Sequence, residues 1–209
     1  MVINIRLRIP KIILIITIVS GEINFISYDT PGLYTLTSKD YGYANKIIVE
    51  LWGGGGGGDG CICVGGGGAG DGAYIKAIIE TKQRKFNLIV GKGGNGGSGS
   101  NNNCKDSTNG NFTSLTSEYL NLTVGGGFAP DINLKSYGGK GGMILSKVDA
   151  DILIAKNGYS GKSSYCGVGA WLCNPVGGDG GSAVMGGSGG NGSCGFVYYP
   201  FCSSPYMMG

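Results

Sequence analysis

Runs of glycine that directly follow short apolar segments constrain this chain more than any other feature of its sequence. The chain has 45 glycines among 209 residues, and residues 53–58 are six consecutive glycines. A glycine costs roughly 0.5–1 kcal/mol of backbone entropy relative to alanine in an ordinary helix or strand. Extended glycine segments can offset that cost, because backbones without side chains approach closely and exchange hydrogen bonds. The runs therefore predict close packing of backbone against backbone.

The segments between the runs have the composition of β-strands. They occupy residues 25–28, 32–37, 46–52, 73–81, 85–90 and 120–124. Residues 143–156 fit either a helical turn or an extended pair, and we expect a strand there. The glycines lack the one-in-three spacing that a collagen triple helix requires, which excludes collagen.

We predict a mainly β fold, in which a framework of short strands carries a layered bundle of glycine-rich polyproline-II helices and is stapled by disulfides. A polyproline-II helix turns every three residues and has no internal hydrogen bonds, so its backbone groups all point outward to neighbours. The alternative is that the glycine runs are flexible loops between the strands of an ordinary β-sandwich.

The N-terminal segment has the pattern of a signal peptide. Arg6, Arg8 and Lys11 precede an apolar run at residues 12–19, which is too short to span a bilayer, and Ser20-Gly21 supplies small residues before Glu22. We expect residues 1–21 to be removed, leaving residues 22–209 as a single glycine-rich domain with a short C-terminal tail. An uncleaved signal anchor and a buried N-terminal strand are the alternatives. After cleavage we expect no membrane attachment.

All the cysteines lie beyond this leader, and in an oxidising compartment such thiols form disulfides. The disulfide candidates are Cys61, Cys63, Cys104, Cys166, Cys173, Cys194 and Cys202. Pairs Cys166–Cys173 and Cys194–Cys202 would each close a short loop. Seven is an odd number, so at least one thiol stays free, is modified or bridges to another chain.

Three sequons give glycosylation candidates at Asn111, Asn121 and Asn191. Large aromatic residues toward the C-terminus predict an exposed contact surface, because aromatic side chains anchor interfaces and stack on sugars. The residues of this surface are Trp171, Tyr198, Tyr199 and Tyr206.

Several kinds of chemistry are disfavoured. The chain has no histidine, which excludes a Ser-His-Asp or Cys-His catalytic arrangement and imidazole metal ligands. Asp149 and Asp151 form a spaced carboxylate pair that is better explained as solvated turn residues. The cysteine spacing matches no standard zinc site. Without the three basic leader residues, 13 basic residues face 13 acidic ones, so we expect no nucleic-acid partner. We predict no enzymatic activity, no cofactor and no metal.

An ordered set of strand ends carries a resemblance to a known family. It comprises Phe25, Pro31-Gly32 with Tyr34-Thr35-Leu36, the strand at 47–52 running into Gly53, Gly72-Ala73-Tyr74, residues 86–91, and a glycine-rich closure at 186–194 before an aromatic strand at 195–199. The pattern resembles the glycine-rich domain of phage tail-fibre tips and of other viral or extracellular proteins. It is more distantly similar to the glycine-rich ectodomain of anaplastic lymphoma kinase-class receptors.

The resemblance implies a β-framework that feeds a sandwich of glycine helices, used for surface recognition or as a rigid tip, without catalysis. The cysteines and the leader are foreign to phage tips, which indicates a eukaryotic or eukaryotic-virus relative that follows a secretory route. We expect a secreted or virion-surface structural protein that assembles into a homo-oligomer or polymer as a fibre, coat or tip subunit. The alternative is an adhesin that binds a cell-surface glycan or protein.

Overall fold

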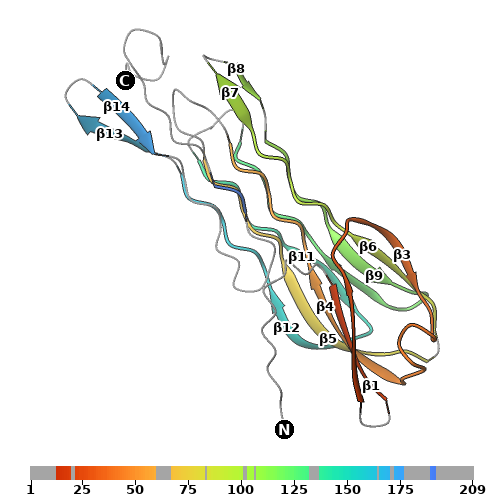
Figure 1. The fold of residues 1–209 in the computed structure, drawn as a ribbon. Helices are drawn as coiled ribbons and strands as arrows, with labels where there is room; N and C mark the ends of the chain where they lie inside the picture. The colour runs from red at the N-terminus through yellow and green to blue at the C-terminus, as the bar shows by residue number, and fades with distance from the viewer. Residues whose placement is uncertain are drawn as a thin grey trace.

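The computed structural model describes residues 13–19, 22–59, 67–82, 84–100, 103–105, 107–131, 137–163, 165–169, 172–176 and 189–191. Over these residues the chain is mainly β and contains no helix. It has two five-stranded antiparallel sheets and two separate hairpins (Figure 1). This part of the chain therefore confirms the predicted fold class.

Each sheet collects strands that are distant in sequence. The first sheet has the order β12 (Asp151–Lys156), β5 (Tyr74–Glu80), β4 (Lys46–Trp52), β1 (Ile13–Val19), β2 (Glu22–Tyr28). The second has the order β11 (Ile144–Val148), β10 (Asn121–Val124), β9 (Thr113–Thr116), β6 (Phe86–Val90), β3 (Gly32–Leu36). The hairpins are β7 (Ser98–Ser100) with β8 (Asn103–Lys105) and β13 (Tyr165–Gly169) with β14 (Leu172–Val176).

Alternating side chains bring the two sheets together as a sandwich. In β4, Ile47, Val49 and Leu51 are buried while the residues between them are more exposed. Strand β6 repeats this two-residue period. The buried residues of both sheets belong to one hydrophobic core, which also contains Tyr41 from the loop after β3.

The apolar run predicted to be the core of a signal peptide forms strand β1. It pairs antiparallel with β2 over its whole length and with β4 from Ile13↔Leu51 to Ile16↔Ile48. This arrangement matches the alternative of an N-terminal strand, while cleavage after Gly21 stays a prediction. Residues 143–156 are extended, as expected, but their two strands β11 and β12 join opposite sheets. The predicted aromatic strand at 195–199 lies outside the described residues.

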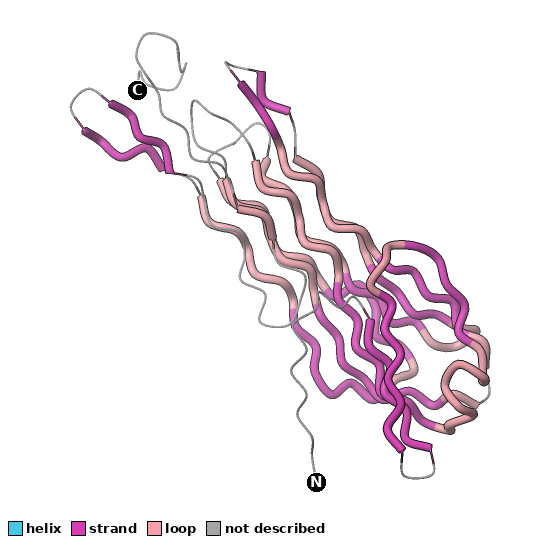
Figure 2. Tube along the Cα trace, viewed as in Figure 1, coloured by secondary structure: helices cyan, strands magenta, loops and turns pink. Residues whose placement is uncertain are grey.

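The glycine runs continue the strands away from the sandwich. They form extended segments at residues 53–59, 67–73, 91–97, 107–112, 125–131, 137–143 and 157–163. Figure 2 shows these segments running side by side beyond the sheets, with hairpins β7–β8 and β13–β14 at the far end. We call these segments the glycine layer and the end with the hairpins the distal end.

Candidate functional site

Backbone hydrogen bonds link the segments of the glycine layer with a three-residue period. The amides of Gly53, Gly56 and Asp59 donate to the carbonyls of Ala73, Gly70 and Gly67, at 2.9, 3.0 and 3.1 Å. The residues that follow Gly53 and Gly56 bond to a different segment. The amides of Gly54 and Gly57 donate to the carbonyls of Asn111 and Thr108, each at 3.0 Å. One segment is therefore bonded to different neighbours around its axis, unlike a flat β-strand.

Glycine is required at many positions of this layer because no space remains there for a side chain. A Cβ added at Gly57 would lie 1.9 Å from the carbonyl oxygen of Asn95, and one at Gly127 would lie 1.9 Å from that of Gly70. These contacts are with backbone atoms, which cannot rotate away. Residues 53–59 and 67–73 are buried throughout. The geometry is a packed layer, which contradicts the alternative of flexible loops for these segments.

A polar and aromatic cluster stands where the sandwich meets the layer. Trp52 and Tyr74, which pair across β4 and β5, have ring centroids 5.3 Å apart. The Tyr74 hydroxyl donates to Glu50 at 2.9 Å, and Glu50 also forms an ion pair of 3.0 Å with Lys76. Burial and the Glu50 carboxylate raise the pKa of Tyr74 far above its ordinary value. The junction is therefore held by contacts on the strands themselves.

One carboxylate lies inside the layer. Asp71 is 1% exposed, and its Oδ1 accepts a 2.9 Å hydrogen bond from the Gly189 amide. Its Oδ2 has no hydrogen-bond partner among the described residues. Burial raises the pKa of the Asp71 carboxyl, and nearby amides oppose that rise only in part. Sequence reasoning missed Asp71, because nothing in a Gly-Asp-Gly string distinguishes a buried aspartate from a turn.

A groove opens on the layer near its distal end. Its volume is about 370 Å³, and its walls come from residues 55–59, residues 93, 94, 96 and 97, Gly190 and Asn191. At Gly93 and Gly96 an added Cβ would meet only ordinary contacts of 3.7 Å, unlike the crowded glycines behind them. The wall is therefore mainly backbone, with no aromatic side chain among its residues.

The cysteines that the structure describes belong to the distal hairpins. Cys104 lies in β8, Cys166 in β13 and Cys173 in β14. The register places Cys166 opposite Pro175 and Cys173 opposite Val168, so these two are not directly opposite each other. Cys61, Cys63, Cys194 and Cys202 lie outside the described residues. The disulfides stay a prediction.

The three sequon asparagines are exposed but differ in setting. Asn121 begins β10, and its Oδ1 accepts a 2.8 Å hydrogen bond from the Thr123 hydroxyl of the same sequon. The Asn111 backbone is bonded to Gly54 and Lys92 within the glycine layer, while Asn191 lines the groove. The predicted contact residues Trp171, Tyr198, Tyr199 and Tyr206 lie outside the described residues.

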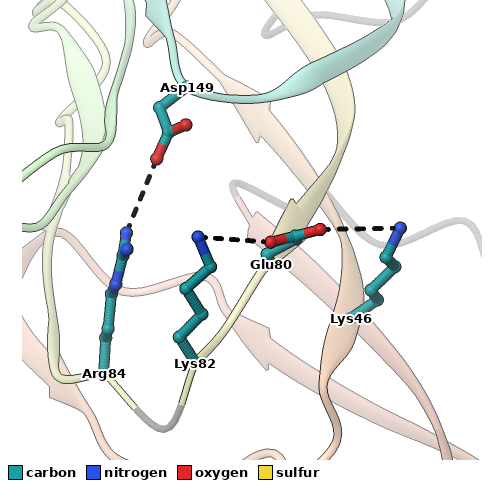
Figure 3. A network of polar contacts seen from close by, with 5 residues as sticks. All are labelled: Lys46, Glu80, Lys82, Arg84 and Asp149. Carbon is teal, nitrogen blue, oxygen red and sulfur yellow. Dashed lines mark hydrogen bonds and ion pairs between the residues drawn. The ribbon is translucent and has the colours of Figure 1, made fainter.

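The end of the sandwich that is farther from the glycine layer carries exposed charges (Figure 3). Lys46 begins β4 and forms a 3.8 Å ion pair with Glu80 at the end of β5, which also contacts Lys82 at 3.4 Å. Asp149 contacts Arg84 at 3.5 Å, and its partner in the carboxylate pair, Asp151, is exposed at the start of β12. Such exposed ion pairs contribute little to stability. The pair Asp149 and Asp151 therefore lies on the surface, away from the groove.

The described residues contain no group of three or more Cys, Asp or Glu side chains placed to hold a metal ion. They also contain no helix of the length and apolarity that crossing a membrane requires.

A family model described as a glycine-rich domain matches residues 30–200. No curated protein matches the chain.

Proposed function

The chain belongs to the glycine-rich domain family, and on that premise we propose that it is a secreted or virion-surface structural protein, a self-assembling fibre, coat or tip subunit. The observation that carries this proposal is the glycine layer, in which an added Cβ would strike backbone at Gly57 and Gly127. Glycines that have no room for a side chain are costly in backbone entropy, and the stiffness of their close packing is the functional benefit.

We further propose that the segments of the layer are polyproline-II helices. The three-residue period of the hydrogen bonds at Gly53, Gly56 and Asp59 supports this, because that helix repeats every three residues. The narrower likeness to phage tail-fibre tips and to anaplastic lymphoma kinase-class receptors belongs to the same proposal. Its support is the arrangement of a sandwich base, a stiff layer and loops at the far end.

Electrophoresis of the native protein with and without reductant, together with negative-stain electron microscopy, tests the structural role. We expect filaments or multimers, and those joined through an unpaired cysteine would dissociate in reductant. A compact monomer under both conditions would refute the proposal.

The second candidate is an adhesin or ligand-binding module for a cell-surface glycan or protein. Hairpins β7–β8 and β13–β14 favour it, because a stiff layer holds them far from the sandwich, where a partner has free access (Figure 1). A monodisperse protein that binds cells, and loses binding when residues 98–105 are replaced by a Gly-Ser linker, would support this candidate over the structural subunit.

A further inference from the structure

Strand β1 occupies an inner position of its sheet, although the sequence predicts that it is cleaved away. It separates β4 from β2, and β2 has no other partner strand in the sheet. Removal of residues 1–21 would leave the backbone groups of β4 opposite Ile13–Ile16, at residues 48–51, without partners. Unpaired strand edges of this kind are templates for pairing with another chain. Cleavage would therefore create both an open edge and a loose strand.

After cleavage, β2 cannot pair antiparallel with the open edge of β4 in its own chain. Because β1 runs antiparallel to both neighbours, β2 runs parallel to β4. Tyr28, the last residue of β2, lies at the end of the sandwich next to the glycine layer, opposite Ile13 and level with Leu51. An antiparallel β2 would need Tyr28 at the other end, roughly 20 Å away for a seven-residue strand.

The connection to β3 is too short and too firmly held for that reversal. Only residues 29–31 join Tyr28 to Gly32, and a link of this length spans at most about 14 Å. The Tyr28 and Tyr34 rings pack 4.8 Å apart, and the Tyr34 hydroxyl donates to the Thr30 carbonyl at 2.8 Å. Gly32 is itself paired with Val90 beside the glycine layer. If β2 moved sideways to β4 without reversing, the two strands would form a parallel pair. This movement would also break the contact between the Tyr28 and Tyr34 rings.

We propose that the mature chain, once residues 1–21 are removed, pairs the open edge of β4 with residues 22–28 of a second copy, running antiparallel. This inference rests on the secretion and cleavage in the proposed function. The new N-terminus at Glu22 leaves the donated strand free at one end, so it reaches outward while Tyr28 stays anchored. Each copy both donates and accepts a strand, which builds a closed dimer or a continuous fibre.

The test starts from the full chain secreted by a eukaryotic host, with the N-terminus determined by mass spectrometry. The molar mass is then measured by light scattering in reductant, so that disulfides make no contribution. We expect a chain that begins at Glu22 and has at least twice the monomer mass. The full-length chain made by cell-free synthesis without membranes retains residues 1–21, so β1 stays in place and the protein should be a monomer.

A pair of variants in β2 separates strand pairing from other association. Phe25→Pro removes a backbone donor, so the mature chain should become monomeric, whereas Phe25→Thr keeps the donor and a strand-forming side chain and should stay multimeric. Strand exchange stabilises the wild-type multimer, so Phe25→Pro should have the thermal midpoint of wild-type protein diluted until it is monomeric, which shows that the remaining sandwich is folded.

The outcomes distinguish this proposal from the structural role itself. A cleaved chain that is monomeric overturns the strand exchange. Cleaved multimers that persist in Phe25→Pro also overturn it, but they leave the structural subunit in place. Secreted protein that retains residues 1–21 refutes the cleavage and the strand exchange together.

Discussion

The glycines of the layer differ in what surrounds each Cα, although they look alike in the sequence. Gly57 faces the backbone of residues 95 and 96, whereas Gly93 faces open space with one atom, the Gly55 carbonyl oxygen, at 3.7 Å. The first position excludes a side chain, and the second accepts a methyl group. A substitution to alanine should therefore lower stability at Gly57 but not at Gly93.

We expect Gly57→Ala to lower the free energy of unfolding by about 1–3 kcal/mol or more, because packed backbones must separate to admit the methyl group. Gly93→Ala is the matched control, and it should leave stability unchanged or raise it by about 0.4–1 kcal/mol through the less flexible unfolded chain. Urea denaturation followed by tryptophan fluorescence measures both. Equal effects of the two variants would contradict the packing described for the layer.

Because of Asp71, we expect the free energy of unfolding to fall as the pH rises, which is the opposite of the usual effect of a carboxylate. Burial raises its pKa above the ordinary 3.8, so between 3.8 and the raised value the folded chain binds more protons than the unfolded chain. The contribution of Asp71 to stability is therefore greatest below pH 3.8 and falls as the pH rises through the folded pKa. Asp71→Asn cannot lose this proton, so its stability relative to the wild type should rise from pH 3 to pH 7.

Asp40 supplies the control of opposite sign for this measurement. The Thr37 amide and hydroxyl donate to its carboxylate at 2.6 and 2.8 Å, and these bonds lower its pKa. Its contribution is present above pH 3.8 and is lost as the pH falls through the lowered folded value. Asp40→Asn should thus lose stability relative to the wild type at pH 7 and recover the difference in acid. A pH-independent difference for Asp71→Asn would refute the account of that residue.

At the scale of the element, alternation of buried and exposed side chains determines which strands hold the sandwich together. Leu115 of β9 is fully buried between the sheets, whereas Leu33 of β3 is 80% exposed. We expect Leu115→Ala to cost about 2–5 kcal/mol and Leu33→Ala less than about 0.5 kcal/mol. Denaturant midpoints at unchanged m-value test this pair. A large effect at Leu33 would show that the outer face of β3 is covered in solution.

The sequence is informative about strands rich in β-branched residues and uninformative about the others. It predicts a strand at residues 46–52, and β4 has those bounds, because Ile47, Ile48 and Val49 are residues typical of strands. Strand β9 was missed, since Thr113-Ser114-Leu115-Thr116 has a single apolar residue and gains its burial from neighbours β6 and β10. The division of residues 143–156 between two sheets was equally hidden, because strand partners are distant in the chain.

For the candidate site, the need for glycine could be predicted, but its surroundings could not. Unbroken glycine at residues 53–58 indicated packed backbones, yet the same letters describe Gly57 and the tolerant Gly93. Burial of Asp71 likewise depends on segments that are 88 and 118 residues away, at Tyr159 and Gly189, which no local pattern reports. The predicted disulfides, sequon use and aromatic surface remain predictions.

At the scale of the whole molecule, the sandwich and the glycine layer share one continuous hydrogen-bond ladder. Trp52 pairs with Tyr74 at the end of the β4–β5 ladder, and the next amide, Gly53, donates to the Ala73 carbonyl at 2.9 Å. Gly56 then donates to Gly70 at 3.0 Å. No turn or hinge interrupts the chain between these bonds. A change in the stability of the glycine layer should therefore also change the stability of the sandwich.

We therefore expect the sandwich and the layer to unfold as one cooperative unit. Hydrogen exchange measured by mass spectrometry should give peptides from residues 67–73 the same slow opening rate as peptides from β4 and β5 under conditions where exchange follows global unfolding. Gly57→Ala should accelerate both sets together, although the substitution lies only in the layer. Fast exchange of residues 67–73 while β4 stays protected would instead make the layer a separate, weaker unit, and a stiff spacer would then be excluded.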